Sequence, residues 1–158
     1  MERSSPISGG LAGLVATAPM SAVMLGLRRL LPRVEQYALP PRQITVAATR
    51  KAGVEEHFDE PVSSLMTVLA HFGYGAAAGA LYAPLSRRAP LPPVAAGIAY
   101  GLVVWTTSYL GLLPALGLIS PAINHPARRN ALMIVAHVVW GAALALLLER
   151  LDAQARRR

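Results

Sequence analysis

The distribution of charged residues constrains the fold of this chain more than any other feature of its sequence. Four windows contain no Asp, Glu, Lys or Arg: residues 4–27, 61–86, 89–127 and 130–148. A helix rises 1.5 Å per residue, so about 20 residues cross a hydrocarbon core of roughly 30 Å. Each window is therefore long enough for one transmembrane helix.

The longest window, 89–127, is interpreted as a single span, because two crossings and a turn need more than about 40 residues. Its second part carries Pro114, Gly117, Pro121 and Pro126, which predict a kinked helix end and an ordered loop. We predict an all-α integral membrane protein with four transmembrane helices in one membrane domain, residues 1–158. The expected segments are spans at about 7–27, 62–85, 94–116 and 130–148, a polar connection at 28–60 and a basic tail at 149–158.

The net charge of +7 raises the question of nucleic-acid binding. A nucleic-acid-binding surface interleaves basic residues with polar or aromatic ones on a folded face. Here the basic residues lie in the connections and at the C-terminal end, where such residues typically contact anionic lipid headgroups. We therefore expect the lipid bilayer, and no nucleic acid, as a partner.

The sequence contains none of the common catalytic patterns. It has no Cys, no HExxH, no GxSxG and no phosphate-binding Walker loop. We interpret Ser108 as an ordinary hydroxyl within a span and not as a nucleophile. The acidic patch Glu55, Glu56, Asp59 and Glu60 around His57 lacks the spacing of a metal site. We expect neither enzymatic activity nor a bound metal there.

The polar connection contains one expected helix. Pro40 and Pro41 are typical of a helix start and Gly53 of a helix end, and Ile44 gives the segment a weakly apolar face. The helix is solvated or lies on the membrane surface. Asp59 or Glu60 is expected to cap the span that follows.

Glycines four residues apart recur in the spans. Two small residues at this spacing lie on one helix face and allow a second backbone to approach closely. We expect these faces to pack the bundle, or equally to join copies of the chain or another membrane protein. The packing glycines are Gly9, Gly13, Gly75, Gly79, Gly97, Gly101 and Gly141.

One pattern occurs twice: His, two residues, an aromatic residue, then Gly-Ala-Ala, beginning at His71 and at His137. If the spans alternate in direction, the second and fourth run parallel, and the histidines lie at similar depths in a two-plus-two repeat. Both rings then face the centre of a four-helix bundle, where membrane proteins build cofactor and transport sites. The candidate ligand or pathway residues are His71, Tyr74, His137 and Trp140.

Three interpretations of the histidine pair remain open. In the leading one, each neutral ring bonds across a helix interface and locks the bundle, and the protein is a structural or assembly component. In the second, the pair ligates haem, or a metal ion, in an electron-transfer module. In the third, the rings line a path for protons or a small solute. No Asp or Glu lies in any span, so an ion-coupled carrier would lack its usual carboxylate.

Three stretches of the second half resemble the YagU-like family of bacterial inner-membrane proteins. They read HFGYGAAAGALYA, GIAYGLVVWTTSYLGLLPALGL and AHVVWGAALALLLER, within residues 65–151. The matching positions are His71, Trp105, Pro114, Gly117, His137 and Trp140. The resemblance implies a multi-span bundle in the cytoplasmic membrane and supplies no reaction or catalytic residue.

Lys and Arg are divided almost evenly between the two sides of the membrane, so the positive-inside rule does not decide the orientation. We expect cytoplasmic termini, because the rule applies best to short connections and tails. The side with the termini carries Arg3, Arg87, Arg88, Arg150, Arg156, Arg157 and Arg158, and the other side carries Arg28, Arg29, Arg33, Arg42, Arg50, Lys51, Arg128 and Arg129.

Overall fold

The computed structural model describes residues 5–54, 57 and 59–157, and these residues contain helices but no strand. Four segments are long and apolar enough to cross a membrane. They are α1 (Pro6–Arg28), α3 (Glu60–Ser86), α4 (Pro93–Thr106) with its continuation to Ala115, and α6 (Ala127–Ala155). The prediction of an all-α fold with four spans is confirmed.

The helix boundaries follow from local sequence signals. The short helix of the connection, α2 (Pro40–Lys51), begins at the expected proline, and Gly53 after it has a φ of 70°. The Asp59 side chain accepts a hydrogen bond from the backbone N–H of Val62 and so caps α3, as predicted. Glu55 and Glu56 of the acidic patch, and Arg3 and Arg158 of the charge comparison, lie outside the described residues.

Two spans differ in detail from the expected ones. Helix α6 continues to Ala155, beyond the expected end of the span at residue 148, since no Gly or Pro interrupts the sequence after Gly141. The third span changes at Thr106 from an α-helix into a π-helical segment (Thr107–Leu112) and then into α5 (Leu113–Ala115). π-Helical turns are rare in proteins, and those that occur often lie at functional sites.

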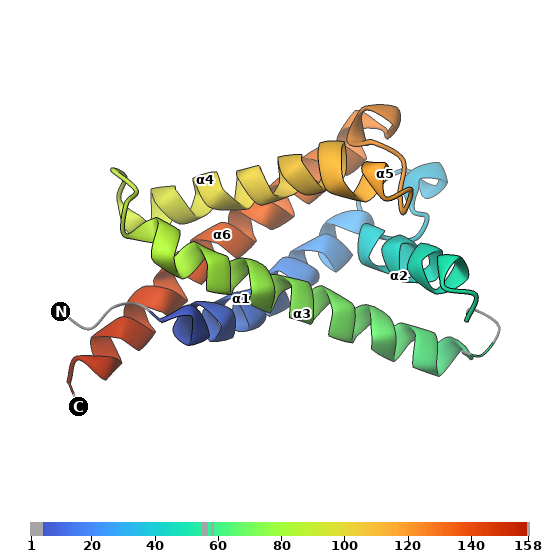
Figure 1. Ribbon diagram of the computed structural model, residues 1–158. Helices are drawn as coiled ribbons and strands as arrows, with labels where there is room; N and C mark the ends of the chain where they lie inside the picture. The colour runs from blue at the N-terminus through green and yellow to red at the C-terminus, as the bar shows by residue number, and fades with distance from the viewer. Residues whose placement is uncertain (1–4, 55–56, 58, 158) are drawn as a thin grey trace.

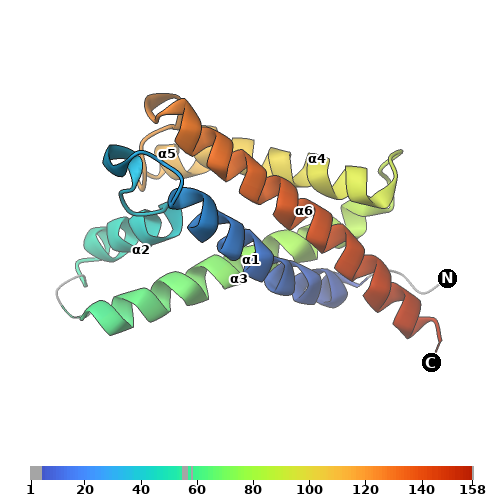
Figure 2. The same ribbon diagram turned by 180° about the vertical axis from the view of Figure 1, so that it is seen from behind.

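The four spans form an open arc in the order α3, α1, α6, α4 (Figures 1 and 2). Helix α1 packs between α3 and α6, and α4 packs on the other side of α6. Helices α3 and α4 meet near the turn that joins them and diverge towards the opposite end of the molecule (Figure 1). The short, proline-rich turn at residues 89–93 predicts that these two helices lie directly side by side as an antiparallel hairpin. That prediction is wrong, because their glycine faces pack against α1 and α6 instead.

Glycine contacts hold each half of the chain together. A Cβ atom on Gly13 would overlap the carbonyl oxygen of Gly75, and one on Gly97 would overlap that of Gly141. Only residues without a side chain allow backbones to approach this closely. The pairs α1/α3 and α4/α6 therefore pack by the same device, as expected for a two-plus-two repeat. Gly9 and Gly79 contact each other in the first pair, and Gly101 lies against the His137 carbonyl in the second.

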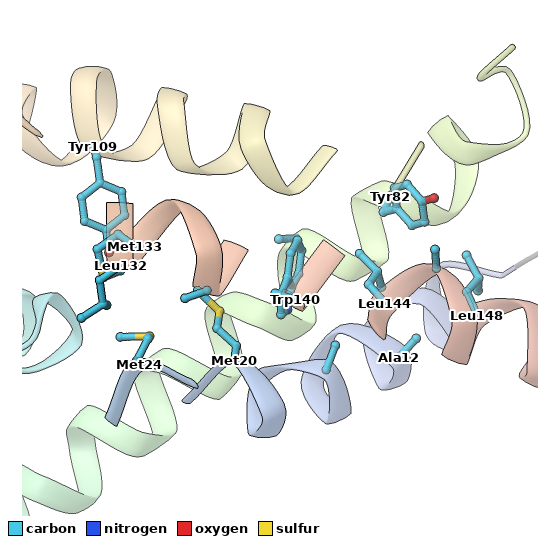
Figure 3. Packing of buried hydrophobic residues seen from close by; sticks show 14 of the residues in the cluster. Ala12, Met20, Met24, Tyr82, Tyr109, Leu132, Met133, Trp140, Leu144 and Leu148 are labelled. Carbon is cyan, nitrogen blue, oxygen red and sulfur yellow. The ribbon is translucent and has the colours of Figure 1, made fainter. Parts of the chain in front are cut away.

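Larger side chains join the two halves where α1 meets α6. Met20 and Met24 of α1 and Trp140 and Leu144 of α6 are buried in this interface (Figure 3). The Trp140 indole N–H also donates a hydrogen bond to the Gly13 carbonyl at 3.2 Å. The two glycine-packed pairs are thus joined along one side, and the side between α3 and α4 stays open.

Helix α2 lies across one end of the open side. Arg42 forms an ion pair with Glu60 and bonds to the Ser63 hydroxyl at the start of α3. At the other end of α2, the Lys51 ammonium donates to the Leu116 carbonyl, at 2.6 Å, just after α5. The helix expected in solvent or on the membrane surface therefore bridges α3 and α5.

Candidate functional site

A cavity of about 240 Å³ lies between the spans, on the open side of the arc. Helices α1, α2, α3 and α6 and all three parts of the third span (α4, the π-helical segment and α5) contribute to its walls. The residues that line it are Thr17, Met20, Pro41, Ile44, Thr45, Ala70, His71, Tyr74, Gly75, Ala78, Val104, Ser108, Tyr109, Leu113, His137 and Trp140.

His137 is held in one orientation in the cavity wall. Its Nδ1 lies 2.7 Å from the Met133 carbonyl oxygen of its own helix. A carbonyl oxygen only accepts, so Nδ1 donates, and in a neutral ring Nε2 is then the acceptor. The Tyr109 ring meets the imidazole edge-on, with centroids 5.8 Å apart and an interplanar angle of 87°. The backbone and an aromatic neighbour thus fix both the tautomer and the tilt of this ring.

His71 lies on α3 in the same cavity. Its Nε2 is buried and has no hydrogen-bond partner among the described residues. Buried polar atoms in proteins are almost always paired, and an unpaired one in a native structure calls for an explanation. The interpretation of the histidines as interface locks is not supported by these contacts, since His137 bonds within its own helix.

Three tyrosine hydroxyls connect α3 with the third span. Going away from the turn, Tyr82 donates to the Pro93 carbonyl at 3.3 Å and Tyr100 donates to the Ala78 carbonyl at 2.8 Å. Farthest from the turn, the Tyr74 hydroxyl lies 2.7 Å from the Ser108 Oγ. Because a tyrosine side chain is long, such bonds connect the two helices even where their backbones diverge. Of these three tyrosines, Tyr74 lines the cavity.

The chemistry of the walls defines what the cavity can hold. No Asp, Glu, Lys or Arg is among the described residues that line it, and most of the lining residues are apolar. Burying an unpaired charge here would be costly, so the site suits an uncharged molecule. An apolar cavity of about 150 Å³ is enough for one benzene ring. A cavity of about 240 Å³ therefore suits one substituted ring, and a haem macrocycle with four pyrrole rings would need it to widen.

The repeated sequence pattern predicted part of this site. All four candidate residues, His71, Tyr74, His137 and Trp140, line the cavity. The pattern gave no signal for Tyr109, and it gave none for the α2 residues that line one end. Ser108 was interpreted as an ordinary span hydroxyl, but the π-helical segment places it opposite Tyr74. The described residues contain no group of three or more His, Asp or Glu side chains arranged to hold a metal ion.

Four apolar spans around an uncharged cavity define a multi-pass helical membrane protein with an internal site of ligand size. A family model described as a protein of unknown function, DUF1440, matches residues 20–146. This range includes every cavity residue except Thr17, and the chain belongs to that family. No curated protein and no solved structure matched the chain.

Proposed function

We propose that this chain is a non-enzymatic binding protein of the cytoplasmic membrane that holds a small uncharged molecule between its spans. The observation that carries the proposal is the cavity itself, which both histidines of the repeat line. A purely structural role accounts for the glycine contacts but not for the cavity, because helix packing normally fills space of this size. It also leaves the unpartnered Nε2 of His71 without a reason.

Binding is better supported than the two functional alternatives. A haem site would use the same two histidines, but the cavity has the size of one ring. A pathway for protons or solutes needs an opening towards each side of the membrane, whereas Pro41, Ile44 and Thr45 of α2 lie at one end of the cavity. The resemblance to YagU-like proteins supports placing the chain in the cytoplasmic membrane of a bacterium.

The proposal is tested with a small aromatic probe and a matched pair of substitutions. Ala70 lines the mouth of the cavity and is exposed, so Ala70→Trp should block the site without disturbing the core. Leu69→Trp, one residue earlier and 62% exposed, adds the same side chain outside the lining. A ligand that binds only the folded state raises the melting temperature in a saturable way. Toluene should do so for the wild type and Leu69→Trp, but not for Ala70→Trp.

Equal behaviour of toluene with all three proteins would reject the binding function. An absorption spectrum of protein purified gently from its native membrane, oxidised and then reduced, separates the haem alternative. We expect no band in the visible range. A Soret band that disappears in His71→Ala or His137→Ala would replace our proposal with a haem protein.

A further inference from the structure

We propose that the cavity recognises a hydroxylated aromatic ring, of the phenol or hydroquinone class, which enters from the lipid bilayer between α3 and α4. This inference rests on the proposed binding function and adds the chemical class of the ligand and its route. Three features of the described residues lead to it: the hydrogen-bonding groups of the walls, their aromatic rings and the position of the mouth.

The first feature is a hydrogen-bond acceptor of known orientation. Because Nδ1 of His137 donates to the Met133 carbonyl, its Nε2 accepts. Nε2 of His71 is buried without a partner in the described structure. A neutral ligand can bond to both rings if it donates a hydrogen bond to Nε2 of His137 and also bonds to Nε2 of His71. A hydroxyl is the smallest uncharged group that both donates and accepts a hydrogen bond.

The second feature is the aromatic wall. Tyr109 and Trp140 are buried in the lining, 8% and 3% exposed. Aromatic rings favour edge-on or offset contacts with other rings at centroid distances of about 4.5–7 Å. The volume fits one substituted ring, and the absence of charge from the described lining disfavours an ionised ligand. An aromatic ring with a hydroxyl meets all of these conditions.

The third feature is where the cavity opens. On α3 the rim residues Ala70 and Tyr74 are exposed, and on the facing helix Val104 and Leu113 are half-buried. These residues lie within predicted spans, between two helices that diverge (Figure 1). Helix α2, which belongs to the polar connection, covers one end of the cavity. The mouth therefore faces lipid, and a ligand dissolved in the bilayer reaches it directly.

The hydroxyl pair of Tyr74 and Ser108 lies at this mouth. Tyr74 is 48% exposed and Ser108 only 3% exposed, so the bond runs from the rim into the interior. Two hydroxyls carry two hydrogens and one bond uses one of them, so the pair has a further hydrogen to donate. An entering hydroxyl thus meets a donor at the rim before it reaches the acceptor on His137.

The same ring chemistry has two sources, a soluble phenol and the head of a membrane quinol whose tail stays in lipid. The test uses the whole protein in lipid nanodiscs and isothermal titration calorimetry, with empty nanodiscs measured in parallel to subtract partitioning. The probes are hydroquinone, 1,4-dimethoxybenzene, which lacks hydrogen-bond donors, and toluene. A decyl-substituted benzoquinol distinguishes the membrane source from the soluble one by its affinity relative to hydroquinone.

Hydroquinone should bind about tenfold more tightly than 1,4-dimethoxybenzene, the difference expected for one net hydrogen bond. The double variant His71→Phe, His137→Phe should lose this preference and bind the two compounds with equal affinity, while its thermal unfolding transition shows that it is folded. Equal affinities in the wild type, or a preference that survives in the double variant, would overturn hydroxyl recognition. If the wild type still binds toluene, the proposed binding function stands. If the wild type does not bind toluene either, both proposals are rejected.

Discussion

The hydroxyl of Tyr74 lies 2.7 Å from the hydroxyl oxygen of Ser108, and this bond joins α3 to the π-helical segment far from the turn between them. The two helices diverge, so the bond crosses space that backbone packing does not fill. Two residues 34 positions apart thereby define the mouth of the cavity. Without the π-helical segment the register after Thr106 would differ, and Ser108 would face another direction.

Tyr74→Phe and Ser108→Ala should each lower the free energy of unfolding, since each removes the same bond. Hydrogen bonds between membrane helices average about 0.6 kcal/mol, with a maximum of about 1.7 kcal/mol. We therefore expect a coupling of about 0.5–1.5 kcal/mol in a double-mutant cycle, measured by unfolding in mixed micelles. Thr107→Ala is the control, because its hydroxyl bonds within its own helix to Val103. A coupling near zero would show that the two hydroxyls do not interact in the membrane.

Gly141→Ala should destabilise the protein far more than Gly73→Ala. A Cβ on Gly141 would overlap the backbone of Gly97 on α4, so the helices would have to separate, whereas one on Gly73 meets no atom within 4 Å. Overpacking of a close contact typically costs about 1–3 kcal/mol, and replacing an exposed helical glycine by alanine typically gains up to about 1 kcal/mol. Thermal unfolding in detergent measures both changes. Similar melting temperatures for the two variants would contradict the glycine-packed pair α4/α6.

His71→Phe should leave stability unchanged or raise it slightly. Its Nε2 has no hydrogen-bond partner in the described structure, and removing an unsatisfied buried polar atom is neutral or favourable. The side chain borders the cavity, so a phenyl ring has room. Thermal unfolding of the ligand-free protein measures the effect, with His137→Phe for comparison, since that change removes a bond to Met133. A loss above about 1 kcal/mol for His71→Phe would point to a packing role instead.

The sequence predicted the spans well because of how lipid acts on a backbone. An apolar stretch of about 20 residues has to bond its own peptide groups in a bilayer, and a helix is the way to do so. The repeat was informative for a similar reason, because two copies of one pattern on parallel spans place His71 and His137 at similar depths. Both now line one cavity.

The order of the helices was not predictable from the same signals. A small-xxx-small face shows that another backbone packs there, but it does not identify which one. Gly75 and Gly79 therefore gave no indication that α3 packs on α1 instead of α4. No local propensity predicts the π-helical segment, in which Ser108 bonds to Tyr74 and Tyr109 packs against His137. The place of α2 follows from Arg42 and Lys51, two surface-like residues whose partners lie far away in the sequence.

Arg129→Met should destabilise the polar connection, whereas the neighbouring Arg128→Met should be nearly neutral. The Arg129 guanidinium is buried and donates to the carbonyls of Glu35, Tyr37 and Ala38, and it lies 3.5 Å from the centre of the Tyr37 ring. Hydrogen bonds from a charged donor contribute about 1.5–3 kcal/mol each when isolated, so we expect a loss of at least about 2 kcal/mol. Limited proteolysis of residues 30–39 is the measurement. Equal cleavage of both variants would show that Arg129 does not anchor the connection.

The orientation of the chain is open to a direct measurement because the sequence contains no cysteine. Val34→Cys places a thiol on the connection, at a position 85% exposed, and Gln154→Cys places one at the exposed end of α6. With the termini in the cytoplasm, a membrane-impermeant maleimide should label Val34→Cys in intact bacterial cells and Gln154→Cys only after permeabilisation.

The buried guanidinium of Arg129 points to protein carbonyls and not to lipid, so the eight basic residues on the connection side overstate its attraction to anionic headgroups. The short turn and the tail then carry the deciding charges. The reverse labelling pattern would place the connection and α2 in the cytoplasm and reject this orientation, while the lateral mouth between α3 and α4 would still face lipid.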